Sequence, residues 1–446
     1  MKSLKTTSLI LASVVAASLA CAQSASAVSG AKPADGASVQ SDANKDRSYV
    51  EDYADKKPTI VMVDASAGRE TPVTLISASE KDFKFKDSSG GELTVPKKSK
   101  SFKFAVKTDS NWGRARNAYA AGNWDEAIVY LRPMVYPLLQ LTPFDEEACK
   151  VHGFVEMYIS CLLNANRLIE AKTLVLAMPI PEIPPSLLSS VISVADALAK
   201  SGDVKGALAI TDKISFDADT MSAMEDMMGL LATLRKCGAT KECVVWYTKL
   251  GNMEGNPFKS ECVLWMVYCD MQLGNKMSAE VYLSSMKVER SEEAFSLLQM
   301  IKGMLKATAE KPNFGEALDL YAEGIVFGNL SSPWMPELLY NAGMAYKKMG
   351  KFVASNEIFL QIAALYPDDP LAARGQKEIV KIEKKPKKVV DEDDEDDQCQ
   401  NTHDHQNRDP GRHGGIQLML GHLSGLGGAV TLGGIALGQA VQRNRA

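Results

Sequence analysis

The feature that most constrains the fold of this chain is a small residue that recurs seven times at nearly constant spacing. Successive occurrences are 44, 36, 36, 36, 38 and 38 residues apart, each within a stretch of helical periodicity. The positions are Ala127, Ala171, Ala207, Cys243, Ala279, Ala317 and Ser355. Small side chains at such positions let two helices cross closely. The spacing therefore predicts a chain built from repeated helical hairpins, the first helix of each ending before the small residue.

Three other positions keep the same register. Five residues before each small residue stand Gly122, Asn166, Gly202, Gly238, Gly274, Pro312 and Gly350, residue types typical of a helix end. Four residues after it stand Leu131, Val175, Thr211, Tyr247, Leu283, Tyr321 and Phe359, on the same helix face. Twelve residues before it stand Ala115, Ile159, Ala195, Leu231, Val267, Leu305 and Gly343, all apolar or glycine. A hairpin of this kind cannot bury its apolar face alone, so neighbouring units must stack.

The last unit, residues 336–369, carries the most complete pattern. It places Gly343, Tyr346, Gly350, Phe352, Phe359 and Pro367 at the positions that characterise the tetratricopeptide repeat family. The first unit also resembles that family, through Ala115, Gly122, Trp124, Ala127 and Leu131. The middle units depart from it, since Lys276 replaces an aromatic residue and only Pro367 preserves the closing proline. Their spacing also exceeds the family's repeat of about 34 residues.

The resemblance implies an α-solenoid of about seven helical hairpins over residues 111–383, with a concave groove that binds a protein or peptide. Groove-facing candidates come from the first helices of the units, and are Tyr158, Trp265, Tyr268 and Tyr340. As an alternative, the same aromatic residues pack in the core between repeats.

Residues 58–107 alternate with a period of two instead. The segments 59–64, 72–77, 82–87, 92–96 and 101–106 each place apolar residues on one face, and SSGG at 88–91 is typical of a hairpin turn. We expect a small antiparallel β-meander or barrel-like unit that leans on the helices, because it is too small for a rich core of its own. The predicted fold class is α+β and mostly α. A leader, residues 28–57, is expected to be disordered.

The first 27 residues have the order of a secretory signal peptide. Lys2 and Lys5 precede the uncharged run SLILASVVAASLA, and the small residues ASA follow. Cleavage is predicted after Ala27, which places the mature protein in the periplasm or outside the cell. A second interpretation is a lipoprotein signal with Cys21 lipidated, although Ser18 stands where that motif has leucine. A third is an uncleaved anchor, for which the apolar run is short.

The charged residues show no basic stripe of the kind that nucleic-acid binding needs, and the formal net charge is −5. The eight cysteines contain no CxxC pair. We expect most of them to be buried, unpaired thiols, with a disulfide framework as the alternative.

The C-terminal part begins with a charged linker, residues 384–415, which includes the acidic run DEDDEDD at 391–397 and is expected to be disordered. A glycine-rich apolar tail, residues 416–446, follows. Its uncharged part, 416–441, has the length of a membrane span but contains seven glycines. The open interpretations are a membrane contact, a flexible tail and a frame error in the gene. Cys399, His403 and His405 are weak candidates for a metal site.

No sequence signature of a hydrolase, metalloprotease or nucleotide-binding enzyme is present. His152 is the one histidine before the linker, and its place at a helix start favours a surface or packing position over a catalytic one. We therefore expect no enzyme activity, no cofactor and no bound metal. The predicted function is an exported scaffold for protein–protein interactions in the cell envelope. The alternative is a structural envelope component that anchors to membrane or cell wall, accessory to envelope assembly or to proton-channel-coupled machinery. The oligomeric state stays open.

Overall fold

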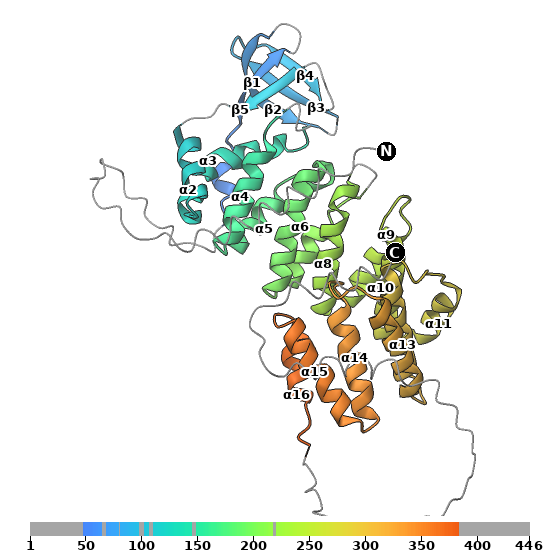
Figure 1. Cartoon of the computed structure of the whole chain (residues 1–446). Coiled ribbons are helices and arrows are strands. Elements are labelled where there is room, and N and C mark those ends of the chain that lie inside the picture. The colour runs from blue at the N-terminus through green and yellow to red at the C-terminus, as the bar shows by residue number, and fades with distance from the viewer. Residues whose placement is uncertain are drawn as a thin grey trace, which may run out of the picture.

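The computed structural model describes residues 48–64, 68–79, 81–97, 102–106, 110–144, 149–216 and 220–382. The predicted signal peptide with Cys21, most of the leader, the linker and the apolar tail lie outside these residues. Within them, a five-stranded antiparallel sheet precedes fifteen α-helices (Figure 1). The predicted fold class, α+β and mostly α, is confirmed at this level.

The sheet contains β1 (Thr59–Asp64), β2 (Glu70–Ala78), β3 (Asp82–Asp87), β4 (Glu92–Pro96) and β5 (Phe102–Val106), in the order β4-β3-β2-β1-β5. All neighbouring strands are antiparallel, and Leu75 to Ser77 form an irregularity in β2. Phe83 and Phe85 are fully buried, whereas the lysines that alternate with them in β3 are exposed. The predicted strands and the direction of their side chains are confirmed.

The apolar face of the sheet packs on the loop that lengthens the first repeat interval to 44 residues. Phe144 of this loop stacks on Phe83 with ring centroids 4.1 Å apart, and lies 4.8 Å from the ring of Phe104. An ion pair between Lys97 and Glu182 joins β4 to the helices as well. The extra residues of the first interval therefore form the surface on which the sheet packs.

Fourteen helices follow one another in the predicted pairs, and the two members of each pair are in contact. The pairs are α2 (Ser110–Ala120) with α3 (Trp124–Leu138), α4 (His152–Asn164) with α5 (Leu168–Leu176), α6 (Pro185–Lys200) with α7 (Val204–Thr211), α8 (Met224–Lys236) with α9 (Thr240–Gly251), α10 (Lys259–Gln272) with α11 (Lys276–Ser285), α12 (Ala294–Ala307) with α13 (Phe314–Phe327), and α14 (Met335–Lys348) with α15 (Phe352–Leu365). A single helix, α16 (Pro370–Glu378), packs on α14 and α15.

Four short 3-10 helices complete the secondary structure: η1 (Glu51–Tyr53), η2 (Leu139–Leu141), η3 (Ile180–Glu182) and η4 (Met221–Ala223). The first of them lies in the leader that was expected to be disordered. Tyr53 stacks on Tyr136 of α3 with centroids 5.2 Å apart, and Tyr49 is buried. Aromatic packing on α3 thus orders the end of the leader.

The conformation of the turn between the two helices of a pair explains why glycine recurs at regular spacing along this sequence. Gly122, Asn166, Gly202, Gly238, Gly274 and Gly350 all have positive φ, between 55° and 95°. In each turn the amide of this residue bonds to the carbonyl three residues earlier, and the next amide bonds to the carbonyl five residues before itself. This is the Schellman arrangement, for which glycine has no steric cost. Six of the seven predicted turn residues are therefore confirmed.

Pro312 is the exception, because its unit closes differently. Helix α12 already ends at Ala307, and the amide of Asn313 bonds to the carbonyl of Lys306 at 3.1 Å. The side chain of Asn313 then caps α13 by accepting from the amide of Glu316. This longer connection needs no left-handed residue at position 312.

The small residues lie where the two helices of a pair cross. Ala127, Ala171, Ala207, Cys243, Ala279, Ala317 and Ser355 are all at most 1% exposed. Ser355 donates to the carbonyl oxygen of Gly343 at 2.9 Å, and Cys243 Sγ lies 3.6 Å from the carbonyl oxygen of Leu231. A Cβ atom on Gly343 would come within 2.7 Å of the Phe359 ring. The predicted packing at distance twelve is confirmed in these pairs.

The other repeat-packing residues vary in exposure. Ala115 and Ala195 are fully buried. Trp124 and Tyr346 are half-buried, while Phe352, the first residue of α15, is exposed and Pro367 lies exposed in the following turn. Residues at the ends of the last pair thus face solvent because only α16 follows them.

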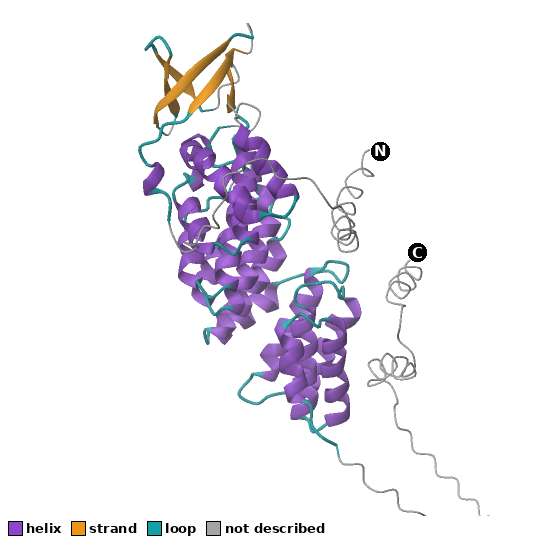
Figure 2. Ribbon diagram, turned by 90° about the vertical axis from the view of Figure 1, so that its left-hand side faces the viewer, coloured by secondary structure: helices purple, strands orange, loops and turns teal. Residues whose placement is uncertain are grey.

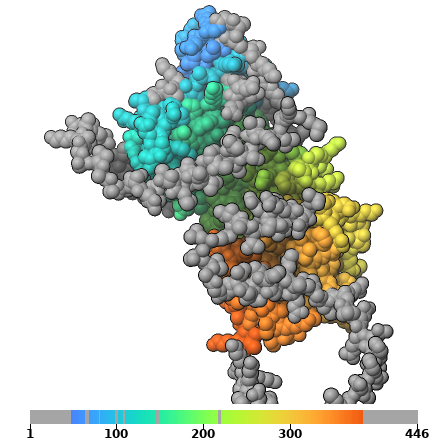
Figure 3. All heavy atoms as spheres, viewed as in Figure 1, coloured from blue at the N-terminus to red at the C-terminus, as the bar shows by residue number. Residues whose placement is uncertain are grey.

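The sheet lies at one end of the molecule and the last helical pair lies at the other (Figure 3). First helices contact one another from α4 through α6 to α8, and again from α10 through α12 to α14. Between these two runs the chain continues through α9, which packs extensively on α10. Figure 2 shows the helices as two successive groups along the axis. The change from one run to the other falls between α8 and α10.

Six cysteines lie in the described residues and none forms a disulfide there; five are buried and Cys237 is exposed. The expectation of unpaired, mostly buried thiols is confirmed for them. Among the same residues, no helix combines the length and apolarity that crossing a membrane requires. The predicted tail segment 416–441 is not among them.

Candidate protein-binding groove

An open groove lies where three parts of the chain meet near the C-terminal helices. It is formed by the end of α8, the loop between α13 and α14, and the turn between α15 and α16, and it encloses about 560 Å³. The residues that line it are Lys236, Leu330, Ser331, Ser332, Pro333, Pro336, Leu365, Tyr366, Pro367, Asp368, Asp369 and Pro370. We call this site the proline groove, since four of these residues are prolines.

Two of the four prolines lie at the starts of helices. Pro336 and Pro370 occupy the first turns of α14 and α16, where the missing amide donor costs nothing. Asp369 caps α16 by accepting from the amide of Leu371 at 2.9 Å. Tyr366 donates its hydroxyl to the carbonyl of Leu330 at 2.7 Å, which ties the two loops together. The walls are therefore fixed by caps and one cross-loop hydrogen bond.

The groove presents apolar side chains to solvent. Leu330 is 53% exposed and Leu365 is 45% exposed. One ion pair crosses the site, with Lys236 Nζ 3.6 Å from Asp369 Oδ2. Burial raises the pKa of the Tyr366 hydroxyl, so it stays a hydrogen-bond donor. The groove can hold an apolar side chain or an extended segment, and its charged lining residues are one lysine, Lys236, and two aspartates, Asp368 and Asp369.

The four aromatic residues expected to line a groove are buried instead. Tyr158, Trp265, Tyr268 and Tyr340 are 0%, 5%, 9% and 6% exposed. This burial favours the alternative given above, in which they belong to the core between helices. Tyr340, for example, packs against Phe359 with ring centroids 5.7 Å apart. In the first helix of these pairs, the aromatic residues lie on the face that packs against neighbouring helices.

Two of these aromatic residues belong to a buried cluster directly beneath the proline groove. Arg235, the neighbour of Lys236, stacks its guanidinium 3.6 Å from the ring centroid of Trp265 and 4.9 Å from that of Tyr268. Its Nη1 lies 3.5 Å from Glu337 Oε2, and Tyr268 donates to Glu337 Oε1 at 2.5 Å. Burial opposes the charge of Arg235, but attraction to Glu337 prevails and raises its pKa. We call this set the junction cluster.

The junction cluster joins the two runs of helices. Arg235 lies on α8, Trp265 and Tyr268 on α10, and Glu337 on α14. Trp334 lies 6.3 Å from Trp265 between ring centroids and donates to Ser296 Oγ of α12 at 2.7 Å. The groove above it is therefore built on residues from both runs.

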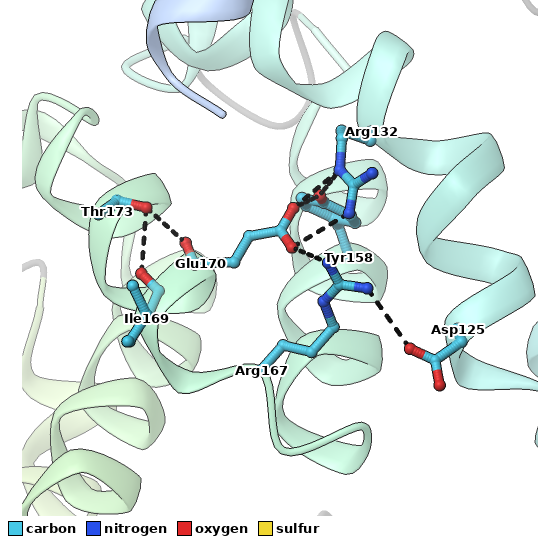
Figure 4. A network of polar contacts seen from close by, with 7 residues as sticks. All are labelled: Asp125, Arg132, Tyr158, Arg167, Ile169, Glu170 and Thr173. Atoms are coloured by element: carbon cyan, nitrogen blue, oxygen red, sulfur yellow. Dashed lines mark hydrogen bonds and ion pairs between the residues drawn. The ribbon is translucent and has the colours of Figure 1, made fainter. Parts of the chain in front are cut away.

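A second buried cluster holds the first units together (Figure 4). Glu170 is fully buried and bonds to Arg132 through both oxygens, at 2.9 and 3.2 Å. Arg167 Nη2 lies 2.9 Å from the same carboxylate, and Tyr158 donates its hydroxyl to it. Burial opposes the charge of Arg132, but the hydrogen bonds to Glu170 outweigh it and raise the pKa of the guanidinium. We call this set the carboxylate cluster.

The carboxylate cluster is closed to ligands. Arg167 also reaches Asp125 at 3.4 Å, and Arg132 stacks 3.7 Å from the ring centroid of Tyr49. Burial raises the pKa of Tyr158 well above its ordinary value, so the phenol remains protonated. The positive and negative groups satisfy one another, which is typical of a structural ion-pair network.

His152 has a packing position, as its place in the sequence suggested. It is the first residue of α4 and is buried, with Nε2 3.0 Å from the carbonyl oxygen of Thr142. In the part of the chain that the structure describes, no three His, Cys, Asp or Glu side chains gather to hold a metal ion. The tail residues Cys399, His403 and His405 fall outside that part.

The sequence contained a signal for the proline groove that the repeat pattern obscured. The stretches SSPWMP and YPDDP each place two prolines around a helix start. Pro367 was interpreted only as the residue that closes a helix. What the sequence does not show is that these two turns and Lys236 lie together, because that depends on how helices far apart in the sequence pack against one another.

In comparisons with known proteins, no protein-family model matches the chain, and no curated protein matches it either.

Proposed function

We propose that this protein is an exported scaffold of stacked helical pairs that binds an extended apolar segment of another protein in the proline groove. The observation that carries the proposal is the groove itself, with Leu330 and Leu365 exposed on walls fixed by Tyr366. Exposed apolar residues on a rigid concave surface are typical of a binding site. The predicted signal peptide places that partner in the periplasm or outside the cell.

Three observations support a scaffold. The left-handed turn residues recur in six of the seven pairs, so the chain is a succession of similar units. Such arrays present long surfaces that suit protein partners. Arg132, Arg167 and Glu170 pair with one another in the carboxylate cluster, and Arg235 pairs with Glu337 in the junction cluster, which accounts for these buried charges structurally. The tetratricopeptide resemblance implies the same class of function.

The experiment is site-specific photo-cross-linking in intact cells. The photoreactive residue benzoylphenylalanine replaces Leu330 in one strain, Leu365 in a second and Val245 of α9 in a third. Val245 is the matched control, because it is 67% exposed but lies outside the groove. We expect the two groove positions to capture the same protein and Val245 not to capture it. Addition of Leu365→Asp to the Leu330 probe should remove that product.

Two outcomes would refute the proposal. The first is that the groove probes yield no product although circular dichroism shows folded protein. The second is that Val245 yields the same product at the same level, since contact would then be independent of the groove. In either case the structural envelope component becomes the better hypothesis.

A further inference from the structure

The last helical unit collects basic side chains at one end. The end of α14, the start of α15 and the end of α16 lie together there, as the contacts of Lys347 with Glu378 show. The residues are Lys347, Lys348, Lys351, Arg374, Lys377 and Lys381. We call this surface the basic end. Five of the six are exposed, and Lys347 is half-buried.

Little negative charge offsets the basic end. Lys347 Nζ lies 2.9 Å from Glu378 Oε2 and 2.8 Å from the Glu378 carbonyl oxygen. The hydrogen bond from Lys347 is the largest cause that lowers the pKa of Glu378, and the charges of Arg374 and Lys348 add to it. One carboxylate thus faces three cations. Asp368 and Asp369 belong to the same unit but lie in the turn before α16, at its other end.

Helix ends explain part of this charge but not all of it. Cations near a helix C-terminus are stabilised by the helix dipole, within the last turn. This accounts for Lys347 and Lys348 at the end of α14 and for Lys377 at the end of α16. It does not account for Lys351, which precedes α15, or for Arg374 near the middle of α16. Arg374 lies 4.9 Å from the ring centroid of Tyr340 and Lys351 lies 6.0 Å from that of Tyr346, but these rings do not neutralise the two charges. The surplus favours an acidic occupant.

We propose that the acidic run of this same chain, residues 391–397, docks on the basic end. Its sequence, DEDDEDD, supplies seven carboxylates without an intervening base. The charges of the two surfaces are complementary, and mutual attraction of this kind selects and orients partners. The C-terminal segment is therefore a tethered occupant of the last unit.

The tether has the right length. Asn356 of α15 holds Val380 by two hydrogen bonds, of 2.8 and 3.0 Å, so the chain leaves from a fixed point beside the basic end. Nine residues separate Lys381 from Asp391. Nine residues span at most about 32 Å even when fully extended, so the run stays within reach of the basic end at an effective concentration in the millimolar range. Even weak ion pairs then keep the surface occupied.

An acidic partner of this surface would therefore compete with the run for the same lysines. Ion pairs between exposed groups are individually weak and screened by salt, so the docked run exchanges readily. The basic end is separate from the proline groove, which is lined by the turn at the start of α16. Occupancy of one site therefore does not require the other.

Zero-length cross-linking of the full chain with the carbodiimide EDC tests this proposal. EDC joins a lysine amine to a carboxylate only when the two are in contact. At about 20 mM salt we expect cross-links from residues 391–397 to Lys348, Lys351 and Lys377, identified by mass spectrometry. At 0.5 M salt the cross-linked fraction should fall at least about fivefold, because the Debye length shortens from about 20 Å to about 4 Å.

Three variants provide the controls. In the first, DEDDEDD is replaced by NQNNQNN, which removes the carboxylates and should abolish these cross-links. In the second, Lys348→Glu is combined with Lys377→Glu, and the remaining cross-link to Lys351 should drop at least about fivefold. Lys347 is left unchanged, because it holds Glu378. Lys205→Glu on α7, an exposed position in another unit, should leave the cross-links unaltered.

Three results would overturn the proposal. One is that the run cross-links only to its sequence neighbours Lys384, Lys385, Lys387 and Lys388. The second is that cross-links to the basic end persist unchanged in the charge-reversed variant. The third is that mixed ¹⁴N- and ¹⁵N-labelled protein gives mainly heavy–light products, since the run would then bind another copy.

Discussion

Both the carboxylate cluster and the junction cluster contain buried arginine side chains, but the groups that stabilise the arginine charge differ between them. In the carboxylate cluster, Arg132 and Arg167 bracket the fully buried Glu170 at ion-pair distances of 2.9 Å. In the junction cluster, Arg235 lies between aromatic rings and its ion pair with Glu337 is longer, 3.5 Å. Glu337 keeps a side-chain exposure of 20%. The first cluster depends on charge, and the second depends largely on stacking.

This difference between the two clusters matches the parts of the chain that each cluster connects. The carboxylate cluster links neighbouring units, with partners 38 residues apart in Arg132 and Glu170. The junction cluster links α8 to α14, and Arg235 and Glu337 are 102 residues apart. A tight ion pair needs fixed geometry, which adjacent units provide. Ring stacking tolerates small shifts between two runs of helices, so it suits the junction.

The largest expected effect tests the carboxylate cluster. Glu170→Gln removes the fully buried charge that pairs with both Arg132 and Arg167, and a buried pair broken in this way costs about 3–5 kcal/mol. We expect a decrease of that size in the free energy of unfolding, measured by urea denaturation. The control is Glu225→Gln on α8, an exposed position, where the change should stay below about 0.5 kcal/mol. Equal effects at the two positions would show that the network contributes nothing specific.

A smaller effect is expected at the junction. Arg235→Met removes the stacked cation and leaves Glu337 unpaired, but water reaches this carboxylate and Tyr268 still donates to it. The expected loss is about 2–3 kcal/mol. Because α8 would no longer be coupled to α14, unfolding should also split into two transitions.

Tryptophan fluorescence and circular dichroism should then give different urea midpoints for Arg235→Met. Lys236→Met is the matched control, since this neighbour is 52% exposed in its side chain and its ion pair is weak. A single transition in Arg235→Met, with coincident midpoints, would mean that the two runs are coupled by other contacts.

The smallest effect concerns pH. Burial, together with the carboxylate of Glu293, raises the pKa of Glu261 on α10 to about 7, from 4.5. The folded state therefore binds more protons than the unfolded state between these values, and stability falls as pH rises from 4.5 to 7. Glu261→Gln should remove this penalty and stabilise the protein by roughly 1–2 kcal/mol at pH 8, after allowance for solvent screening.

Thermal melts at two pH values check the result for Glu261→Gln. The variant should melt higher than the parent at pH 8 and equally near pH 3.5, where Glu261 is mostly protonated in both the folded and the unfolded state. A stabilisation that is the same at both values would have a cause other than ionisation.

The parts of the fold that could be predicted are those that depend on residues close together in the sequence. Gly202 and Gly238 mark the turns because a left-handed residue is needed there, and Asn166 takes the same conformation with φ of 55°. Such a requirement leaves glycine at five of the seven turns. The strands were predictable for the same reason, since alternation of Phe83 and Lys84 is a local pattern.

What could not be predicted depends on distant partners. Tyr158 and Tyr340 were expected in a groove because they lie on first helices, yet which face of a helix is covered depends on the next pair. Phe144, on which the sheet packs, lies in a loop outside the repeat register. The proline groove needs Lys236 beside Asp369, and no periodicity specifies that pair.

The twelve-residue pairing inside each hairpin has a consequence for the order in which the chain folds. Contacts such as Ser355 with Gly343 close short loops, whereas Arg235 and Glu337 close one of 102 residues. Loop-closure entropy makes the longer contact costlier by about 2 kcal/mol. Hairpins therefore assemble early and quickly, as expected of low contact order, and the junction closes last. By the same reasoning, the junction is where a partly open form of the native protein first separates.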